Sequence, residues 1–206
     1  MKIGFLLFDD VEELDFAGPW ELFSSWSERD ETIECLTVSQ HMDMIRCANG
    51  LKVLPDTDFE FCPALDLLLV PGGQGTRREV NNPELVSFVQ RQAASCKWVL
   101  SVCTGAFVLQ AAGLLKGKKA TTHWQSLDRL RAFPEVIVVE ERFVRDDPVW
   151  TAAGVSAGMD LALAVIAELA GSDMAGRVQL GAEYYPRQVR YGSAHLSDQA
   201  PGYLRE

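Results

Sequence analysis

Cys103 is the residue of this 206-residue chain best suited to covalent chemistry. It follows the buried-strand pattern Val99-Leu100-Ser101-Val102 and precedes Thr104-Gly105-Ala106-Phe107, where a helix is expected to begin. Small residues two positions before and after a nucleophile, here Ser101 and Gly105, permit the sharp strand-to-helix turn of a nucleophile elbow. A thiol at a helix N-terminus is favoured as the thiolate. We therefore predict that Cys103 is a nucleophile, the alternative being a cysteine that is simply buried.

A second candidate segment is Pro71-Gly72-Gly73-Gln74-Gly75, which follows another buried apolar run. Consecutive glycines at the carboxyl end of a strand allow backbone N–H groups to point at a developing negative charge, as in an oxyanion hole. The segment is no phosphate-binding loop, because no Gly-Lys-Ser/Thr follows. Gly72 and Gly73 are therefore candidate oxyanion or substrate-binding residues, with an ordinary turn as the alternative.

Two titratable residues lie near other predicted strand ends. Asp15 could act as a general acid or base, or could be an acidic residue near a helix start at which Pro19 takes the first helical position. His123 could orient a substrate or tune the thiolate, or could cap the next helix. These residues alone leave both choices open, and we interpret Glu12 and Glu13 as solvated charges.

The elements that would position these residues alternate along the chain. Strand-length apolar runs occur at residues 3–7, 35–38, 65–70, 98–102, 136–139 and 149–152, and helical patterns at 19–25, 83–94, 105–112, 124–133 and 156–169. Several of the apolar runs lack the alternation of a strand with one solvated face. The order predicts an α/β fold with a mostly parallel central sheet and helices on both faces.

Two segments interrupt the alternation and are predicted as antiparallel additions: residues 49–62, and the pair 143–145 and 149–151 around Asp146-Asp147-Pro148. The chain has no internal repeat and no linker rich in Gly, Ser or Pro. We therefore predict a single domain over residues 1–206. The tail after about residue 191 is weakly hydrophobic and is expected to be extended or to dock on a partner subunit.

Composition argues against several classes of function. The formal net charge of -10 opposes nucleic-acid binding. The first apolar run is interrupted by Asp9-Asp10 and is interpreted as a strand, not a signal peptide, and no stretch approaches the roughly 20 apolar residues of a membrane span. Five cysteines without CxxC spacing predict free thiols in a reducing cytoplasm and no structural zinc.

Three segments together resemble the DJ-1/PfpI superfamily, and the resemblance covers nearly the whole chain. They are Ser101-Val102-Cys103-Thr104-Gly105, Ala111-Ala112-Gly113-Leu114-Leu115 and Ala120-Thr121-Thr122-His123-Trp124. This combination is similar to bacterial isocyanide (isonitrile) hydratases and to the N-terminal domains of AraC-type regulators, and we expect no DNA-reading half before the chain ends at Glu206. The resemblance implies a flavodoxin-like three-layer sandwich, related to class I glutamine amidotransferases, and a homodimer with the site near the subunit interface.

The resemblance also implies roles for particular residues. Cys103 would be the nucleophile, with the carboxyl group of Asp15 beside it. The Leu-Asp-x-x-Gly-Pro context of Asp15 and the presence of Thr104 match the hydratase-like branch. Many other members have Glu at the position of Asp15, and protease-like members have His at the position of Thr104. Gly72 matches a position whose N–H faces the reactive sulfur, and Val155 matches an apolar residue near the site.

These residues predict hydration of a small-molecule substrate, an organic isocyanide, to an N-substituted formamide, without a metal or organic cofactor. Cys103 would form a covalent thioimidate and Asp15 would protonate the substrate carbon. Because a nearby carboxylate raises a thiol's pKa, the pair should share one proton. The alternatives are a thiol-based sensor or protective protein, a regulator-like ligand-binding domain, and a glyoxalase-type activity, against which Asp15 and Thr104 argue.

Overall fold

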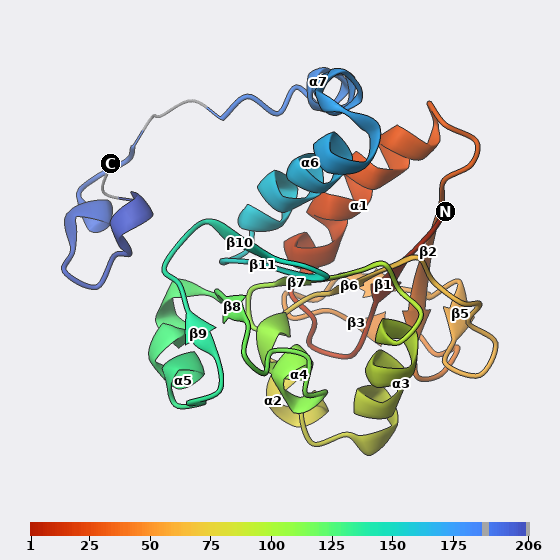
Figure 1. Cartoon of the computed structure of the whole chain (residues 1–206), viewed down its shortest axis with the longest axis horizontal. Helices are drawn as coiled ribbons and strands as arrows, with labels where there is room; N and C mark the ends of the chain where they lie inside the picture. The colour runs from red at the N-terminus through yellow and green to blue at the C-terminus, as the bar shows by residue number, and fades with distance from the viewer. Residues whose placement is uncertain (187–189, 205–206) are drawn as a thin grey trace.

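A seven-stranded sheet runs through the centre of the computed structural model, which describes residues 1–186 and 190–204 (Figure 1). In order across the sheet, the strands are β10 (Phe143–Asp146), β11 (Val149–Ala152), β7 (Trp98–Val102), β6 (Leu67–Val70), β1 (Lys2–Leu6), β2 (Glu34–Ser39) and β5 (Thr57–Asp58). Each pairing is parallel except that of β10 with β11. The prediction of a mostly parallel sheet is confirmed.

Helices cover both faces of this sheet (Figure 1). One layer contains α1 (Glu13–Ser27), α6 (Ala157–Ala170) and α7 (Ser172–Gly181), and the other contains α2 (Thr76–Glu79), α3 (Pro83–Ala93), α4 (Gly105–Ala111) and α5 (Leu127–Arg131). The arrangement is the predicted flavodoxin-like three-layer α/β sandwich.

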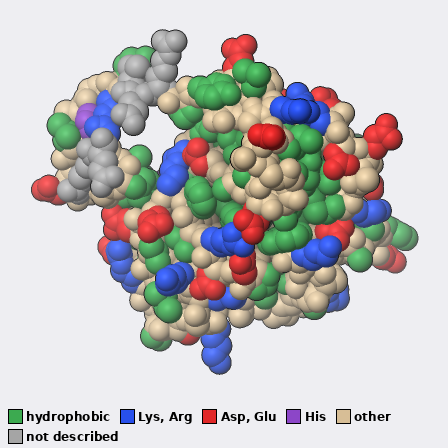
Figure 2. Space-filling view, turned by 45° about the horizontal axis from the view of Figure 1, so that its top comes forward, with side chains coloured by type: hydrophobic (Ala, Val, Ile, Leu, Met, Phe, Trp, Pro, Cys, Tyr) green, Lys and Arg blue, Asp and Glu red, His purple; other side chains and the backbone are tan. Residues whose placement is uncertain are grey.

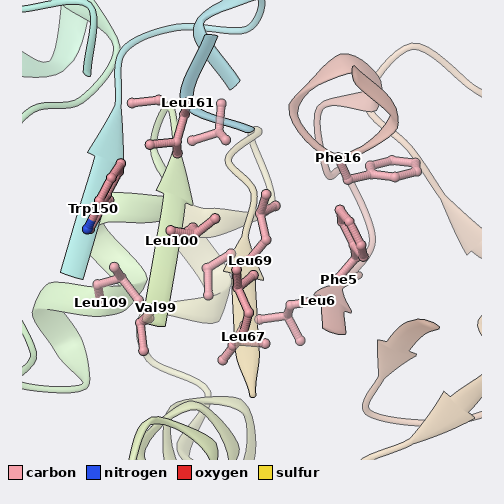
Figure 3. Close-up of a cluster of buried hydrophobic side chains, with 14 of the residues drawn as sticks. Phe5, Leu6, Phe16, Leu67, Leu69, Val99, Leu100, Leu109, Trp150 and Leu161 are labelled. Atoms are coloured by element: carbon pink, nitrogen blue, oxygen red, sulfur yellow. The ribbon is translucent and has the colours of Figure 1, made fainter. Parts of the chain in front are cut away.

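The apolar core lies between these layers, and it is built from strand side chains that meet the helices on both faces (Figure 3). Phe5, Leu67 and Leu69 from the central strands are fully buried, and Phe16 of α1 and Leu161 of α6 also belong to the core. Burying a side chain of this size contributes about 1.5–3 kcal/mol. The packed centre fixes the carboxyl ends of β6, β7 and β11, which are followed by five of the candidate site residues: Gly72, Gly73, Cys103, Thr104 and Val155. Asp15 lies in the first turn of α1.

Two helix predictions differ from the structure. Helix α1 begins at Glu13 and continues through Pro19, so the prediction that Pro19 takes the first helical position is wrong. Pro19 has no N–H to donate to the carbonyl of Asp15 four residues earlier, yet the buried face of the helix extends over both residues. The helix expected over residues 124–133 is a 3-10 turn, η1 (Trp124–Ser126), followed by the short helix α5.

Two small sheets lie outside the central sheet. β3 (Ile45–Arg46) and β4 (Lys52–Val53) form an antiparallel pair, while β8 (Lys119–Ala120) and β9 (Ile137–Val138) form a parallel pair. The antiparallel prediction for residues 49–62 therefore holds for β4 but not for β5, which joins β2 in parallel. The predicted hairpin around residues 146–148 is confirmed as β10 and β11.

The tail from residue 190 to 204 is not simply extended. It contains two 3-10 turns, η2 (Ala194–Leu196) and η3 (Gly202–Leu204). The N–H of Gly202 donates to Glu140 Oε1 at 3.0 Å, so this part of the tail contacts its own chain. Residues 205–206, which the prediction for the tail also included, lie outside the described residues.

The surface carries charges of both signs. On the face shown in Figure 2, Lys and Arg side chains are interspersed with Asp and Glu side chains. No helix in the described part of the chain is long and apolar enough to cross a membrane.

Candidate active site

Cys103 lies at the sharp turn between β7 and α4. Its backbone has a φ of 57°, in the left-handed region that costs an L-residue on the order of 1–3 kcal/mol. Surrounding contacts hold this conformation: the N–H of Cys103 donates to the carbonyl of Ala153 at 2.8 Å, and Thr122 Oγ1 donates to the Cys103 carbonyl at 2.7 Å. A Cβ at position 105 would lie 2.1 Å from the carbonyl oxygen of Val70, so Gly105 is required there. This is the geometry of the predicted nucleophile elbow.

The carboxyl group of Asp15 is fully buried beside Cys103. Its Oδ2 accepts the N–H of Gly72 at 2.8 Å, and its Oδ1 has no nitrogen or oxygen partner among the described residues. Burial raises the pKa of Asp15 from 3.8 to about 7, and the charge of Glu12 raises it as well. The Gly72 N–H and the Cys103 thiol oppose this rise by hydrogen bonding. The carboxyl group therefore exchanges its proton near neutral pH.

The thiol of Cys103 is also buried, with 7% of the residue exposed. Burial raises the pKa of the thiol, and the charge of Asp15 raises it further. The N–H groups of Thr104 and Val155 donate to the sulfur and lower the pKa, but burial outweighs them. The N–H groups at the turn thus favour the thiolate as predicted, but the net pKa of the thiol is raised because of its burial, which the prediction did not include. The predicted effect of the carboxylate is confirmed. Asp15 loses its proton before Cys103 does.

The N–H groups of Gly72 and Gly73 are used within the protein. Gly72 donates to Asp15 and not to the sulfur, which corrects the expectation for this residue. Gly73 donates to Thr104 Oγ1 at 3.0 Å, and Thr104 donates back to the Gly73 carbonyl at 3.2 Å. The buried Thr76 hydroxyl lies 3.1 Å from the Thr104 hydroxyl, a contact that no sequence signal indicated. The two glycines thus hold the side chains of Asp15 and Thr104 in place.

Val155 and His123 form another wall of the site. Val155 has a φ of 45°, which is unusual for a β-branched residue and brings its N–H to the sulfur. His123 Nδ1 accepts the N–H of Gln125 at 3.3 Å, so the capping interpretation is confirmed. Its ring packs on Gly154, where a Cβ would lie 2.2 Å from His123 Cδ2. Burial lowers the pKa of His123, which keeps the ring neutral at pH 7 and unable to stabilise a thiolate by charge.

A cavity of about 190 Å³ lies over the sulfur. The predicted residues that line it are Gly73, Cys103, Thr104, His123 and Val155. Sequence reasoning missed five further lining residues, Glu12, Gln74, Arg77, Gln125 and Ser126, of which Glu12 had been interpreted as a solvated charge. Gln74 and Arg77 closely follow the Gly72-Gly73 pair, which is the signal that could have identified them. Within the described residues, no three His, Cys, Asp or Glu side chains gather in a way that could hold a metal ion.

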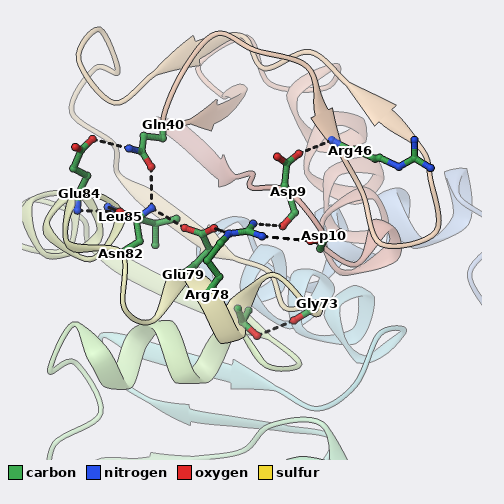
Figure 4. A network of polar contacts seen from close by, with 11 residues as sticks. Asp9, Asp10, Gln40, Arg46, Gly73, Arg78, Glu79, Asn82, Glu84 and Leu85 are labelled. Carbon is green, nitrogen blue, oxygen red and sulfur yellow. Dashed lines mark hydrogen bonds and ion pairs between the residues drawn. The ribbon is translucent and has the colours of Figure 1, made fainter.

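A polar network beside the site ties α2 to the loop after β1 (Figure 4). Arg78 donates to the carbonyl of Asp9 at 2.9 Å and to the buried Glu79 at 2.7 Å, and Asn82 donates to Glu79 at 2.7 Å. A larger cavity of about 540 Å³ lies along this network, but Cys103 does not line it. The network therefore supports the segments on either side of the thiol rather than supplying the reactive groups.

Known proteins resemble this chain along most of its length. The isonitrile hydratase of Pseudomonas putida is 42% identical over 186 residues, which cover 90% of this chain and 79% of that protein. The HTH-type transcriptional regulator GbdR of Pseudomonas aeruginosa is 33% identical over 86% of this chain, but the match covers 49% of the regulator. The crystal structure of a ThiJ/PfpI family protein from Pseudomonas syringae superposes with a TM-score of 0.87 at 34% identity, covering 99% of this chain and 82% of that one. The model of the DJ-1/PfpI family matches residues 1–168, and this chain is therefore a member of the DJ-1/PfpI family.

Proposed function

We propose that this protein is an isocyanide hydratase that converts R–NC and water to an N-substituted formamide. The observation that carries the proposal is the buried carboxyl group of Asp15, with Oδ1 free of nitrogen and oxygen partners, beside the Cys103 thiol. A carboxyl group with a pKa of about 7 is partly deprotonated at neutral pH and can accept the thiol proton. The 42% identity to an isonitrile hydratase supports the same reaction.

In the first half of the proposed reaction, Asp15 removes the thiol proton of Cys103. The sulfur attacks the terminal carbon of the isocyanide, and a C–S bond forms. Asp15 then gives its proton to that carbon, which produces a neutral thioimidate, R–N=CH–S–Cys103. The N–H groups of Thr104 and Val155 stabilise the sulfur while it carries charge.

In the second half, water adds to the thioimidate carbon and a proton moves to the nitrogen. The C–S bond then breaks, which releases R–NH–CHO, and the sulfur recovers its proton. Gly72 and Gly73 act by holding Asp15 and Thr104 in position, and His123 shapes the cavity as a neutral ring. The net reaction consumes one water molecule and no redox equivalent, so no cofactor is needed for its balance.

Formamide production from cyclohexyl isocyanide by the purified, reduced protein tests this proposal. We expect Cys103→Ala to abolish turnover and Asp15→Asn to lower kcat by about 10²–10⁴-fold, the usual contribution of general acid–base catalysis. Cys47→Ala removes a thiol that is also buried and is the matched control. If the unmodified protein hydrates neither cyclohexyl isocyanide nor a smaller isocyanide, or if Cys103→Ala retains full turnover, the proposal is wrong.

A second candidate, a regulator-like ligand-binding domain, is favoured by the 33% identity to GbdR. It predicts that Cys103→Ala binds the same small molecule as the unmodified protein and that neither converts it. The thiol-sensor alternative is less well supported, because oxidation depends on thiolate character and exposure, and burial raises the pKa of Cys103.

We also propose that the protein acts as a homodimer. Apolar side chains that are about half exposed or more gather around the β3–β4 hairpin: Met42, Met44, Leu51 and Leu54. The Asn49 N–H donates to Glu13 Oε1 at 2.7 Å, so this hairpin lies against the start of α1, near Asp15. Sedimentation velocity should give twice the chain mass, and Leu54→Glu should shift the protein to monomer.

A further inference from the structure

The cavity over Cys103 contains a guanidinium group that has no carboxylate partner. Arg77 of α2 lines this cavity, and its Nη1 donates to Gln74 Oε1. Within residues 1–186 and 190–204 it forms no ion pair, and the same is true of Arg46, Arg91, Arg129 and Arg177, while five other arginines each pair with Asp or Glu. Among these unpaired arginines of the described chain, Arg77 is the one that lines the cavity over Cys103.

A second guanidinium group is close enough for its charge to interact with that of Arg77. Arg129 of α5 is stacked on the ring of Phe107, with 4.0 Å between its Cζ and the ring centroid, and it too forms no ion pair in the described part of the chain. Burial lowers the pKa of Arg129, and the charge of Arg77 lowers it as well. Two like charges held close together repel, and an anion bound beside them would relieve the repulsion.

The cavity also carries a competing negative charge. Glu12, which precedes α1, is the carboxylate among the described lining residues, and its Oε1 lies 3.3 Å from Asn49 Nδ2. The side chains of Gln74 and Gln125 add neutral hydrogen-bonding groups. An anionic group would therefore be drawn to the α2 side of the cavity and away from Glu12.

We propose that the substrate of this site carries a carboxylate, which Arg77 binds while the reactive carbon contacts Cys103. Arg129 does not line the cavity and adds to the positive field from outside it. A cavity of about 190 Å³ admits only a small molecule, smaller than the drug-sized ligands of typical pockets of roughly 300–1,000 Å³. The identity of the reactive group, an isocyanide, rests on the proposed function. With that function, the substrate class is a short isocyano carboxylic acid.

Alkylation of Cys103 tests the anion site without relying on turnover. Iodoacetate and iodoacetamide have nearly the same size, and with either reagent the sulfur forms a C–S bond and iodide leaves. Mass spectrometry of the Cys103 peptide gives the rate constant for each reagent. The ratio of the iodoacetate to the iodoacetamide rate constant should fall about tenfold in Arg77→Gln, because one charge-assisted contact is lost, and about threefold in Arg129→Gln. Arg91→Gln removes an exposed arginine on α3 and should leave the ratio unchanged. An equal ratio in the unmodified protein and Arg77→Gln overturns the proposal.

Turnover of isocyanoacetate and of its neutral methyl ester gives the second measurement. The acid-to-ester ratio of kcat/KM should fall about tenfold in Arg77→Gln, mainly through KM, because the charge-assisted contact is lost. Turnover of the ester but not of the acid overturns the carboxylate site and leaves the hydratase function intact. Turnover of neither substrate, together with an Arg77-dependent alkylation ratio, overturns the hydratase function and supports the anion site.

Discussion

Replacing Asp15 by asparagine should stabilise the folded protein at neutral and alkaline pH while it removes activity. The side chain is fully buried, and burial raises the pKa of its carboxyl group from 3.8 to about 7. An amide of the same shape can still accept the N–H of Gly72, which donates to Oδ2 at 2.8 Å. The substitution therefore removes a charge that the folded protein holds at a cost and keeps the neighbouring hydrogen bond.

The size of the effect follows from the two pKa values. Between pH 3.8 and about 7, the folded protein keeps a proton on Asp15 that the unfolded chain has lost, so the free energy of unfolding falls as pH rises through this interval. The interval spans about 3 pH units, and each unit is worth about 1.4 kcal/mol. The folded protein therefore loses about 4 kcal/mol of unfolding free energy by about pH 7, and this loss does not grow further at higher pH. Asp15→Asn should show no such loss, so its advantage over the unmodified protein should grow from near zero at low pH to about 4 kcal/mol at pH 8.

Urea unfolding followed by circular dichroism at pH 5, 6, 7 and 8, in the presence of a reductant, measures this difference. Subtracting the two proteins at each pH cancels the titration of groups that they share. Asp43→Asn removes one carboxylate from an exposed loop and controls for the change in net charge. A stability difference that stays constant from pH 5 to pH 8 would refute the raised pKa of Asp15 and with it the proton-acceptor role.

Three further outcomes are expected. Gly72→Ala should abolish formamide production and lower the free energy of unfolding by about 1–3 kcal/mol in urea titrations. A Cβ at this position would lie 2.5 Å from the Thr104 nitrogen and 2.8 Å from Asp15 Oδ2, so full activity would contradict the position of this loop. Thr76→Val should cost about 1–2 kcal/mol of unfolding free energy and lower kcat, since the hydroxyl donates to the Gly73 carbonyl at 2.7 Å, and Thr76→Ser should restore both quantities. The kcat/KM for isocyanide should rise with pH around a midpoint near 7, as Asp15 loses its proton, and a profile flat from pH 5 to pH 8 would show that another group accepts the proton.

The strand pattern and the sharp turn at Cys103 could be predicted because they depend on local composition. Central strands covered on both faces must be apolar throughout, and this property is visible in the run from Leu67 to Val70. The elbow requires small residues on both sides of Cys103, and one of them, Gly105, leaves no room for a Cβ. The start of α1 was missed because a proline normally marks the first turn of a helix, whereas tertiary packing here holds Pro19 inside it.

The details of the site depend on contacts between distant segments, which a single sequence does not contain. The turn and the carboxylate shift the pKa of the thiol in the predicted directions, but the larger rise from burial was missed because the burial of Cys103 is a property of the assembled layers. The partner of the Gly72 N–H is set by how α1 packs beside the loop after β6. The left-handed backbone of Val155 is not expected of a β-branched residue, so no pattern indicated that its N–H reaches the sulfur.

The central strand β7 leads directly into Cys103, and β6 and β11 pair with it along both of its edges. Amide hydrogens in such a strand exchange with solvent only when the cooperative unit that contains it opens, at a free energy close to that of global unfolding. The nucleophile should therefore keep its geometry until the whole sheet melts. Helix α2 has only four residues and lies outside the sheet, and Thr76 and Glu79 attach it to its surroundings by hydrogen bonds, so we expect it to open at a lower free energy than β7. Mild denaturation should thus disturb Arg77, the proposed carboxylate ligand, before it disturbs the turn at Cys103.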